Sequence, residues 1–259
     1  MPRTGEPGRS VGSRLLQLLF AFSTERAELT IADLTRATGM PHATVRRLVL
    51  ELVAAGALDR HEDGRLTVGL KLWQLGTLAP LTESLQTLAL PYMEDLYTAL
   101  RQHVQLAVLK GPEAVIVERL SAPEAVGLAS QVGGRLPLHC SGVGKVLLSH
   151  ADPQVLDGLV ADGLRRYTAH TVTDPAALAN EIAACRKTGT ATVRGELTEE
   201  ADSVATRIVD GKGRVVAALS VVVRSGTVKH HAVLPSVVTS GLAISRQLGW
   251  RPGVRIRTG

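Results

Sequence analysis

The sequence predicts an α+β protein, in which a mostly helical N-terminal segment precedes a larger domain of strands and helices. Two patterns lead to this prediction. The first 78 residues contain short helix patterns separated by tight turns, and the rest of the chain alternates hairpin-joined strands with helices. The composition fits a globular protein, because 45% of the 259 residues are hydrophobic and 20% are charged.

The N-terminal segment begins with about ten polar residues, 1–10, that we expect to be flexible. A leucine-rich helix is predicted next, over 13–22. Thr30 and Asp33 have the spacing of a capping box, which opens a short helix. Gly39 suits the left-handed position that follows the end of a helix.

A second helix begins after Pro41, because proline fits the first turn of a helix. Its apolar residues recur at helical spacing and predict one buried stripe, formed by Val45, Leu48, Val49 and Leu52. Two short strands, 57–60 and 65–68, follow. Asp63-Gly64 between them suggests a type I′ hairpin turn, in which both central residues have positive φ.

Two short helices joined by a glycine turn and followed by a hairpin describe a winged helix-turn-helix, which places its second helix in the major groove of DNA. The candidate DNA-binding residues lie on the outer face of that helix and in the wing: His42, Ala43, Thr44, Arg46, Arg47 and Arg65. The alternative is a plain helical hairpin with a solvated arginine pair. The net charge of +5 does not decide between these two readings, because residues 1–80 carry ten Lys/Arg against eight Asp/Glu and the charge is not concentrated there.

The remaining elements predict a short apolar helix and then the larger domain. The helices are expected at 70–78, at 84–101 with an interruption or a new start at Pro91, at 141–150, from Thr173 to Gly189 and at 233–248. Strands are expected at 104–109, 114–119, 126–132, 203–209 and 214–223. Glycine-containing turns at 110–113 and 210–213 join two pairs of these strands into hairpins.

Four segments, 30–52, 62–70, 135–148 and 217–221, resemble the IclR (isocitrate lyase regulator) family of bacterial transcription factors in order and spacing. The resemblance implies a DNA-binding domain at 11–69, a linker helix at 70–82 and an effector-binding domain with a GAF/PAS-like mixed sheet at 83–250.

The same resemblance implies a regulator whose affinity for a double-stranded DNA operator changes when a small molecule binds. It also implies self-association into dimers or tetramers. The apolar residues of the linker helix would then lie at the dimer seam or, alternatively, in the core of their own chain: Leu70, Leu72, Trp73 and Leu75. A second reading of the whole chain is a small-molecule-binding module that acts through protein–protein contacts.

Ser141 to Lys145 opens a helix with two glycines, and the unpaired amides of a helix N-terminus attract anions. The resemblance assigns effector binding to Gly142 and Val143 in this loop. It places further pocket positions at Val193, Ser203, Ser220 and Val222, although the two serines could equally be ordinary strand hydroxyls. The two valines would leave a compact acid such as glyoxylate poorly paired, so we expect a larger, partly apolar or aromatic ligand with an anionic or carbonyl end.

Enzyme motifs do not fit the chain. A phosphate-binding loop at 142–145 fails because positions 139 and 146 are His and Val, and position 139 also excludes a hydrolase nucleophile elbow. No cysteine or histidine spacing suggests a metal, so no metal, cofactor or catalytic residue is predicted. Cys140 could be redox-sensitive or a buried inert thiol. Neither a signal peptide nor a membrane span is recognised, so we expect a cytoplasmic protein with no membrane partner.

Overall fold

A computed structural model of the chain describes residues 10–23, 26–77, 80–123, 125–127 and 130–251. Of the N-terminal segment predicted to be flexible, residues 1–9 lie outside this description. The contacts within the chain divide it into two compact units after Glu83. The two units are therefore described separately.

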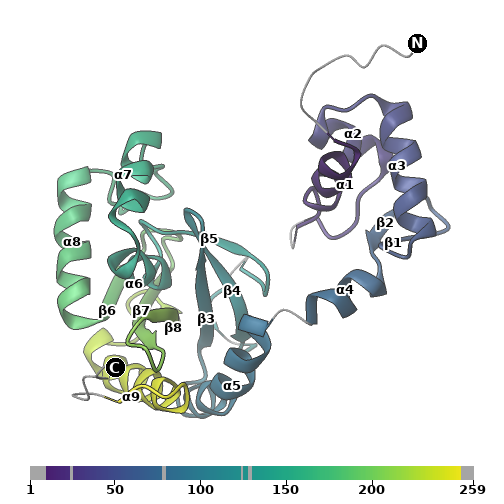
Figure 1. The fold of residues 1–259 in the computed structure, drawn as a ribbon. Coiled ribbons are helices and arrows are strands. Elements are labelled where there is room, and N and C mark those ends of the chain that lie inside the picture. The colour runs from purple at the N-terminus through teal and green to yellow at the C-terminus, as the bar shows by residue number, and fades with distance from the viewer. Residues whose placement is uncertain (1–9, 24–25, 78–79, 124, 128–129, 252–259) are drawn as a thin grey trace, which may run out of the picture. The chain divides into compact units, whose positions relative to one another are not determined.

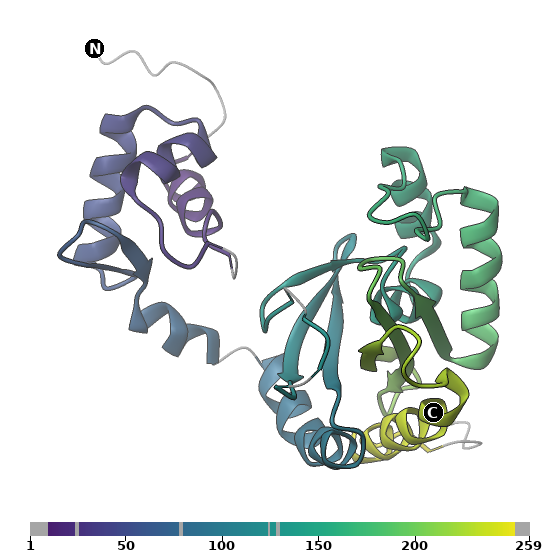
Figure 2. The same ribbon diagram turned by 180° about the vertical axis from the view of Figure 1, so that it is seen from behind.

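The first unit consists of helices around a small core and a two-stranded hairpin (Figure 2). Its elements are α1 (Val11–Leu19), α2 (Ile31–Thr38), α3 (His42–Ala54), β1 (Leu58–Arg60), β2 (Leu66–Val68) and α4 (Leu70–Thr77). Thr30 and Asp33 form the predicted capping box, and Gly39 ends α2 with a φ of 66°. The predicted stripe of α3 is buried against leucines of α1, α2 and the hairpin. This arrangement confirms the helix-turn-helix and its wing.

The turn of the wing differs from the expected type I′ geometry. Gly64 has a φ of 84°, but among the described residues only Arg101 is a non-glycine with positive φ, so Asp63 does not share it. The Gly64 amide donates to the carbonyl of His61, and the His61 amide donates to that of Arg65. The prediction was wrong because the loop has three residues. Hairpin loops of this length combine a type I turn with one residue in the left-handed conformation, here Gly64.

The predicted linker helix over 70–82 overlaps two helices of the structure. α4 ends at Thr77 and α5 (Pro80–Leu100) begins at Pro80, while residues 78–79 lie outside the description. Within α5, the predicted interruption at Pro91 is wrong, because the helix continues through this residue. Proline removes one backbone donor, but the buried side chains on either side, among them Ala89 and Met93, hold the helix on the sheet.

The second unit is built on one sheet of six described strands in the order β5-β4-β3-β8-β7-β6. The strands are β3 (His103–Lys110), β4 (Glu113–Leu120), β5 (Arg135–Pro137), β6 (Thr190–Arg194), β7 (Ala201–Val209) and β8 (Val215–Arg224). All of their pairings are antiparallel. The expected mixed sheet is thus corrected to an antiparallel one, since hairpins join neighbouring strands and the first and last hairpins meet at β3 and β8.

The predicted strand over 126–132 is also wrong. None of the described residues in this range belongs to a strand, and the edge strand β5 begins only at Arg135. Val126 is buried, and its carbonyl accepts a hydrogen bond from Nε2 of His103 instead of a ladder bond. Glycines at 133 and 134 then turn the chain into β5, with Gly133 at a φ of 81°.

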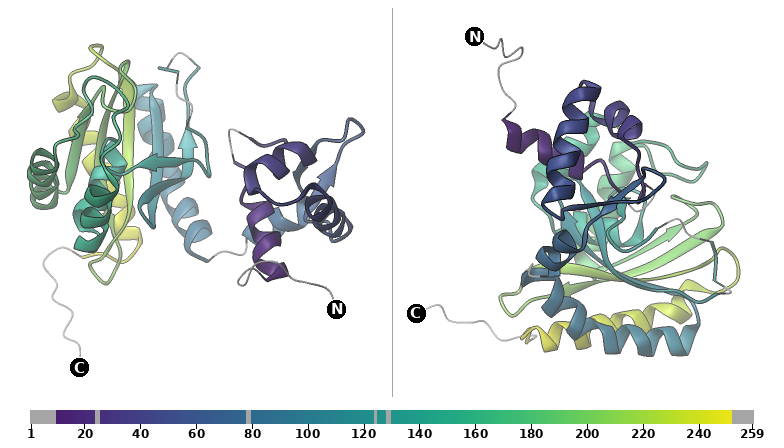
Figure 3. Two further views of the ribbon diagram at one scale, coloured as in Figure 1. Left: turned by 90° about the horizontal axis from the view of Figure 1, so that it is seen from above. Right: turned by 90° about the vertical axis from the view of Figure 1, so that its right-hand side faces the viewer.

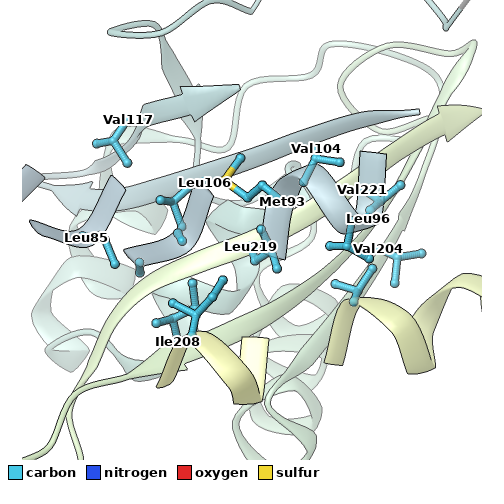
Figure 4. Close-up of a cluster of buried hydrophobic side chains, with 14 of the residues drawn as sticks. Leu85, Met93, Leu96, Val104, Leu106, Val117, Val204, Ile208, Leu219 and Val221 are labelled. Atoms are coloured by element: carbon cyan, nitrogen blue, oxygen red, sulfur yellow. The ribbon is translucent and has the colours of Figure 1, made fainter. Parts of the chain in front are cut away.

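Helices cover both faces of the sheet (Figures 1 and 3). α5 and α9 (His230–Gln247) lie side by side on one face, where Leu85, Met93 and Leu96 of α5 pack against strand residues such as Leu106 and Leu219 (Figure 4). The other face carries α6 (Gly142–His150), with α8 (Pro175–Thr188) packed beyond it, and the sequence analysis did not predict α7 (Pro153–Asp162). Among the described residues no helix is long and apolar enough to cross a bilayer.

Small side chains determine how closely α6 approaches the sheet. The residues beneath the helix are alanines on four strands, Ala107, Ala191, Ala205 and Ala218. Because alanine adds only a methyl group above the backbone, the first turn of α6 lies directly on the strands. Its N-terminus is thereby held over β7 and β8.

Candidate DNA and effector sites

The outer face of α3 carries the predicted DNA-binding side chains. His42, Ala43, Arg46 and Arg47 are exposed, and Thr44 is half-buried. This exposure follows from the helical spacing, since the stripe of buried residues occupies the opposite face. Arg47 forms an ion pair with Glu51, at 3.0 Å between Nη1 and Oε1, whereas Arg46 has no ion pair among the described residues.

The wing arginine is already paired. Nη1 of Arg65 lies 2.8 Å from Oε2 of Glu28, and its Nε lies 3.2 Å from Oδ2 of Asp63. The hydrogen bond that Arg65 donates to Glu28 and the charge of Asp63 raise the pKa of the Arg65 guanidinium. Arg65 therefore remains a cation on the surface, where Glu28 and Asp63 are exposed partners that another anion could replace.

At the N-terminus of α6, two backbone donors have no acceptor in the part of the chain that the structure describes. Ser141 caps the helix, because its Oγ accepts from the amide of Gly144 and donates to the carbonyl of Pro137. No described group accepts a hydrogen bond from the amides of Gly142 or Val143, although both residues are buried. Buried amides are normally paired, so this helix end is suited to an anionic or carbonyl oxygen.

The sheet below this helix end brings the other predicted effector residues together. Val193, Ser203 and Val222 are directly opposite one another on β6, β7 and β8, and therefore form one row on a single face. Ser220 lies in the next row, opposite Ala205 of β7. A Cβ atom on Gly142 would overlap Oγ of Ser203, which shows that the loop rests on this face. The side chain of Val143 packs in the core, so this residue offers only its backbone amide to a ligand.

Ser220 is the most unusual member of this group. It is 1% exposed, and its Oγ has no hydrogen-bond partner in the described part of the chain. An ordinary strand hydroxyl would bond a neighbouring carbonyl, so the ladder alternative does not describe this residue. A buried hydroxyl without a partner costs about 1–3 kcal/mol, which a ligand oxygen would offset.

The sequence analysis missed three polar residues on the same face. The three are His103 and Gln105 of β3 and Arg119 of β4. Gln105 lies opposite Ser220, Arg119 lies opposite Gln105, and His103 lies opposite Val222. The pattern that marks two of them is visible in the sequence, since His103 and Gln105 alternate with apolar residues in a strand that is otherwise hydrophobic.

Lys145, which suggested a phosphate-binding loop, is engaged elsewhere. Its Nζ lies 2.6 Å from Oε2 of Glu181 and 2.6 Å from Oε1 of Glu196. Burial raises the pKa of the Cys140 thiol to about 12, with Glu196 adding to the effect. A thiol of this kind stays protonated at neutral pH, so the geometry favours the inert alternative.

His139 is buried, and its Nε2 pairs with the carbonyl of Arg165, as expected for a structural histidine. Within the ranges that the structure describes, no three His, Cys, Asp or Glu side chains gather in a group suited to a metal ion.

Comparison with known proteins relates both units to one family. The model of the IclR helix-turn-helix domain matches residues 13–62, and that of the bacterial transcriptional regulator IclR C-terminal domain matches residues 82–250. The Pca regulon regulatory protein of Pseudomonas putida is 31% identical over 249 residues, which cover 95% of this chain and 85% of that protein. The transcriptional regulator XynR of Escherichia coli is 28% identical, with coverage of 92% and 96%.

A solved structure is similar over the same length. The crystal structure of an IclR homologue from Microbacterium hydrocarbonoxydans, complexed with 4-hydroxybenzoate, has a TM-score of 0.87 and 34% sequence identity. The match covers 92% of this chain and 99% of that one. Together with the exposed helix of the first unit and the unpaired polar groups of the second, these matches lead to one conclusion. The chain belongs to the IclR family of bacterial transcriptional regulators, which join a helix-turn-helix DNA-binding domain to a C-terminal effector-binding domain.

Proposed function

We propose that this chain binds a DNA operator through α3 and its wing, and that an aromatic or partly apolar carboxylate bound beneath α6 changes its affinity for that operator. The observation that carries the proposal is a set of buried polar groups that have no partner among the described residues: the amides of Gly142 and Val143 and the hydroxyl of Ser220. They lie on the face that also holds Ser203, Val193 and Val222.

The DNA contacts are assigned to the exposed face of α3. Arg46 and Arg47 are suited to a guanine edge or a phosphate, and His42, Ala43 and Thr44 begin the helix that would enter the groove. Arg65 would contact the backbone from the wing. Exposed ion pairs contribute little to stability, so a phosphate can replace Glu28 or Glu51 as the partner of an arginine.

The effector is assigned to the face beneath α6 by the chemistry of that face. The helix end and the serines supply donors for an oxygen, while Val193 and Val222 supply apolar surface. A similar protein holds 4-hydroxybenzoate, which has both kinds of surface. We therefore assign the aromatic acids to this chain ahead of compact acids such as glyoxylate.

Regulation requires two DNA-binding domains in one assembly. α4 exposes three large apolar side chains, Leu70, Trp73 and Leu75, and only Leu72 of the predicted seam is half-buried. An exposed apolar surface of this kind favours self-association. The chain would act as a dimer or tetramer on paired half-sites, without catalysing a reaction, and in the cytoplasm, where the chromosome lies.

A gel-shift experiment tests the DNA part, with a labelled fragment from upstream of the chain's own gene at a stated salt concentration. The wild-type protein should shift the fragment, and the double variant Arg46→Ala/Arg47→Ala should not. Arg135→Ala, which removes an exposed arginine of the second unit, is the control and should bind as the wild type does. A shift retained by the double variant would place the DNA contacts elsewhere.

The effector part is tested in the same assay by adding 4-hydroxybenzoate. The apparent affinity of the wild-type protein for DNA should change, and that of Gly142→Ala should not, because the new Cβ would overlap Ser203. Gly142→Ala should still bind DNA, which shows that it is folded. Tighter binding of glyoxylate than of aromatic acids in calorimetry would contradict the assigned ligand class.

A further inference from the structure

The face of the sheet beneath α6, which holds Ser203 and Ser220, also carries a cation, Arg119. We call it the effector face, and Arg119 lies at its far end from the α6 N-terminus. Arg119 of β4 pairs in register with Gln105 of β3, which in turn pairs with Ser220 of β8. Residues directly opposite one another in an antiparallel sheet share a face, so Arg119 and Ser220 belong to the same row. The row continues to Ala205, which lies under Gly142.

The guanidinium of Arg119 bends over the neighbouring strand. Its Nη2 lies 3.4 Å from Nδ1 of His103 on β3. The Nε2 of His103 lies 2.5 Å from the carbonyl of Val126, to which it must donate, so Nδ1 is the acceptor and the ring is neutral. Burial and the nearby charge of Arg119 both lower the pKa of His103, which agrees with this assignment. The imidazole thus orients the guanidinium without neutralising it.

Arg119 has no acidic partner among the described residues. Its Nε is buried and without a hydrogen-bond acceptor, and none of the described ion pairs includes it. The only polar contact to its guanidinium there is the neutral His103. A partly buried charge without a counterion is unfavourable, so a position of this kind is suited to an anion supplied by a ligand.

The part of the effector face between Gly142 and Arg119 suits a partly apolar ligand. Two strand spacings, about 10 Å, separate β7 under Gly142 from β3 under the guanidinium. The residues of β8 between them are Ser220 and Val222, one hydroxyl and one apolar side chain. Gln105 is buried and donates to Oγ of Ser130, so a described part of the β4–β5 loop lies over this strand.

We infer that Arg119 binds the carboxylate of the effector, and that the effector has two polar ends. The carboxylate pairs with the Arg119 guanidinium, and a second oxygen, such as a phenol hydroxyl, accepts from the amides of Gly142 and Val143 and bonds the hydroxyl of Ser220. This inference rests on the proposed effector site and adds the second anchor. The ligand class is a hydroxyaryl carboxylate or another acid with an oxygen at the far end.

Calorimetry with three probes tests the inference: 4-hydroxybenzoate, 4-hydroxybenzamide, which lacks the charge, and benzoate, which lacks the hydroxyl. The wild-type protein should bind 4-hydroxybenzoate at least about tenfold more tightly than either of the others, since hydrogen bonds to charged groups are the stronger ones. Arg119→Gln should lose about the same factor for 4-hydroxybenzoate but bind 4-hydroxybenzamide as the wild type does. Arg135→Gln is the matched control, because Arg135 is an exposed arginine on the adjacent strand.

The thermal midpoint of the unliganded protein separates this role from a structural one. Removing an unpaired cation should leave the midpoint of Arg119→Gln equal to or above that of the wild type, whereas a structural arginine would lower it. An equal loss of affinity for the charged and the neutral probe would overturn the inference, and so would unchanged binding of 4-hydroxybenzoate. If Gly142→Ala abolishes binding and Arg119→Gln does not, the inference fails and the proposed site stands. If no probe binds the wild-type protein, both fail.

Discussion

Lys145 is a buried cation whose two partners differ in their surroundings. Its side chain is 3% exposed, that of Glu196 is 8% exposed and that of Glu181 is 45% exposed. The pair with Glu196 is therefore shielded from water, while the pair with Glu181 is open to it. Oε2 of Glu196 has no further partner in the described part of the chain, so this carboxylate depends on Lys145.

Replacing Lys145 by Met should cost about 3–5 kcal/mol of the free energy of unfolding, because it leaves the Glu196 charge buried without a partner. Glu181→Gln should cost less than about 1 kcal/mol, since solvent already screens that carboxylate. Urea unfolding of the full-length chain measures both values. Equal losses in the two variants would show that burial does not separate the two pairs as the structure indicates.

Among the helices, α6 and α7 each contain a glycine whose surroundings differ. A Cβ on Gly144 of α6 would lie 2.7 Å from the backbone Cα and carbonyl oxygen of Leu138. Nothing described lies within 4 Å of the corresponding position on Gly158 of α7. Glycine at 144 is therefore required by packing, whereas glycine at 158 only lowers the helix propensity.

We expect Gly144→Ala to destabilise the chain by more than about 2 kcal/mol, because the backbone of Leu138 must move. Gly158→Ala should instead stabilise it by about 0.5–1 kcal/mol, the usual gain in an open helix interior. Thermal unfolding of the two variants beside the wild-type protein gives the sign of each change. A stabilising Gly144→Ala would mean that α6 does not pack against the backbone of Leu138 as described.

For the assembly as a whole, α4 provides the surface that we assign to self-association. Leu70, Trp73 and Leu75 are 63%, 64% and 65% exposed in the single chain. Within the first unit, these values exclude the alternative that the three side chains fill the core. Burying such side chains between two chains would contribute about 1.5–3 kcal/mol each.

Replacing both Trp73 and Leu75 by Glu should therefore convert the oligomer into single chains of 27.4 kDa. The same variant should bind operator DNA more weakly, because one chain contacts only one half-site, and should bind 4-hydroxybenzoate unchanged. Sedimentation velocity measures the mass, with Lys71→Glu as the control that changes the net charge of α4 by as much as the double variant does, without removing apolar surface. A wild-type protein that sediments as a single chain at micromolar concentration would contradict the assignment.

Errors in the sequence analysis occurred where packing overrides a local preference. Pro91 usually ends a helix, yet the buried face of α5 continues through it. The range 126–132 has the apolar residues of a strand, but Val126 bonds a histidine of β3 instead of a neighbouring strand. The helix α7 was also missed, because ten residues are too few for a clear periodic pattern even though Val155, Leu156 and Leu159 pack against the core.

The sequence by itself determined the local elements and the family. Capping at Thr30, the glycine that ends α2, the glycine turns of the hairpins and the stripe of α3 all depend on residues a few positions apart. Only the tertiary structure decided that β3 lies beside β8, and hence that Arg119, Gln105 and Ser220 share one row. The reason is physical. Turn chemistry and helical periodicity act over a few residues, whereas the partner of a strand is selected by packing across more than a hundred.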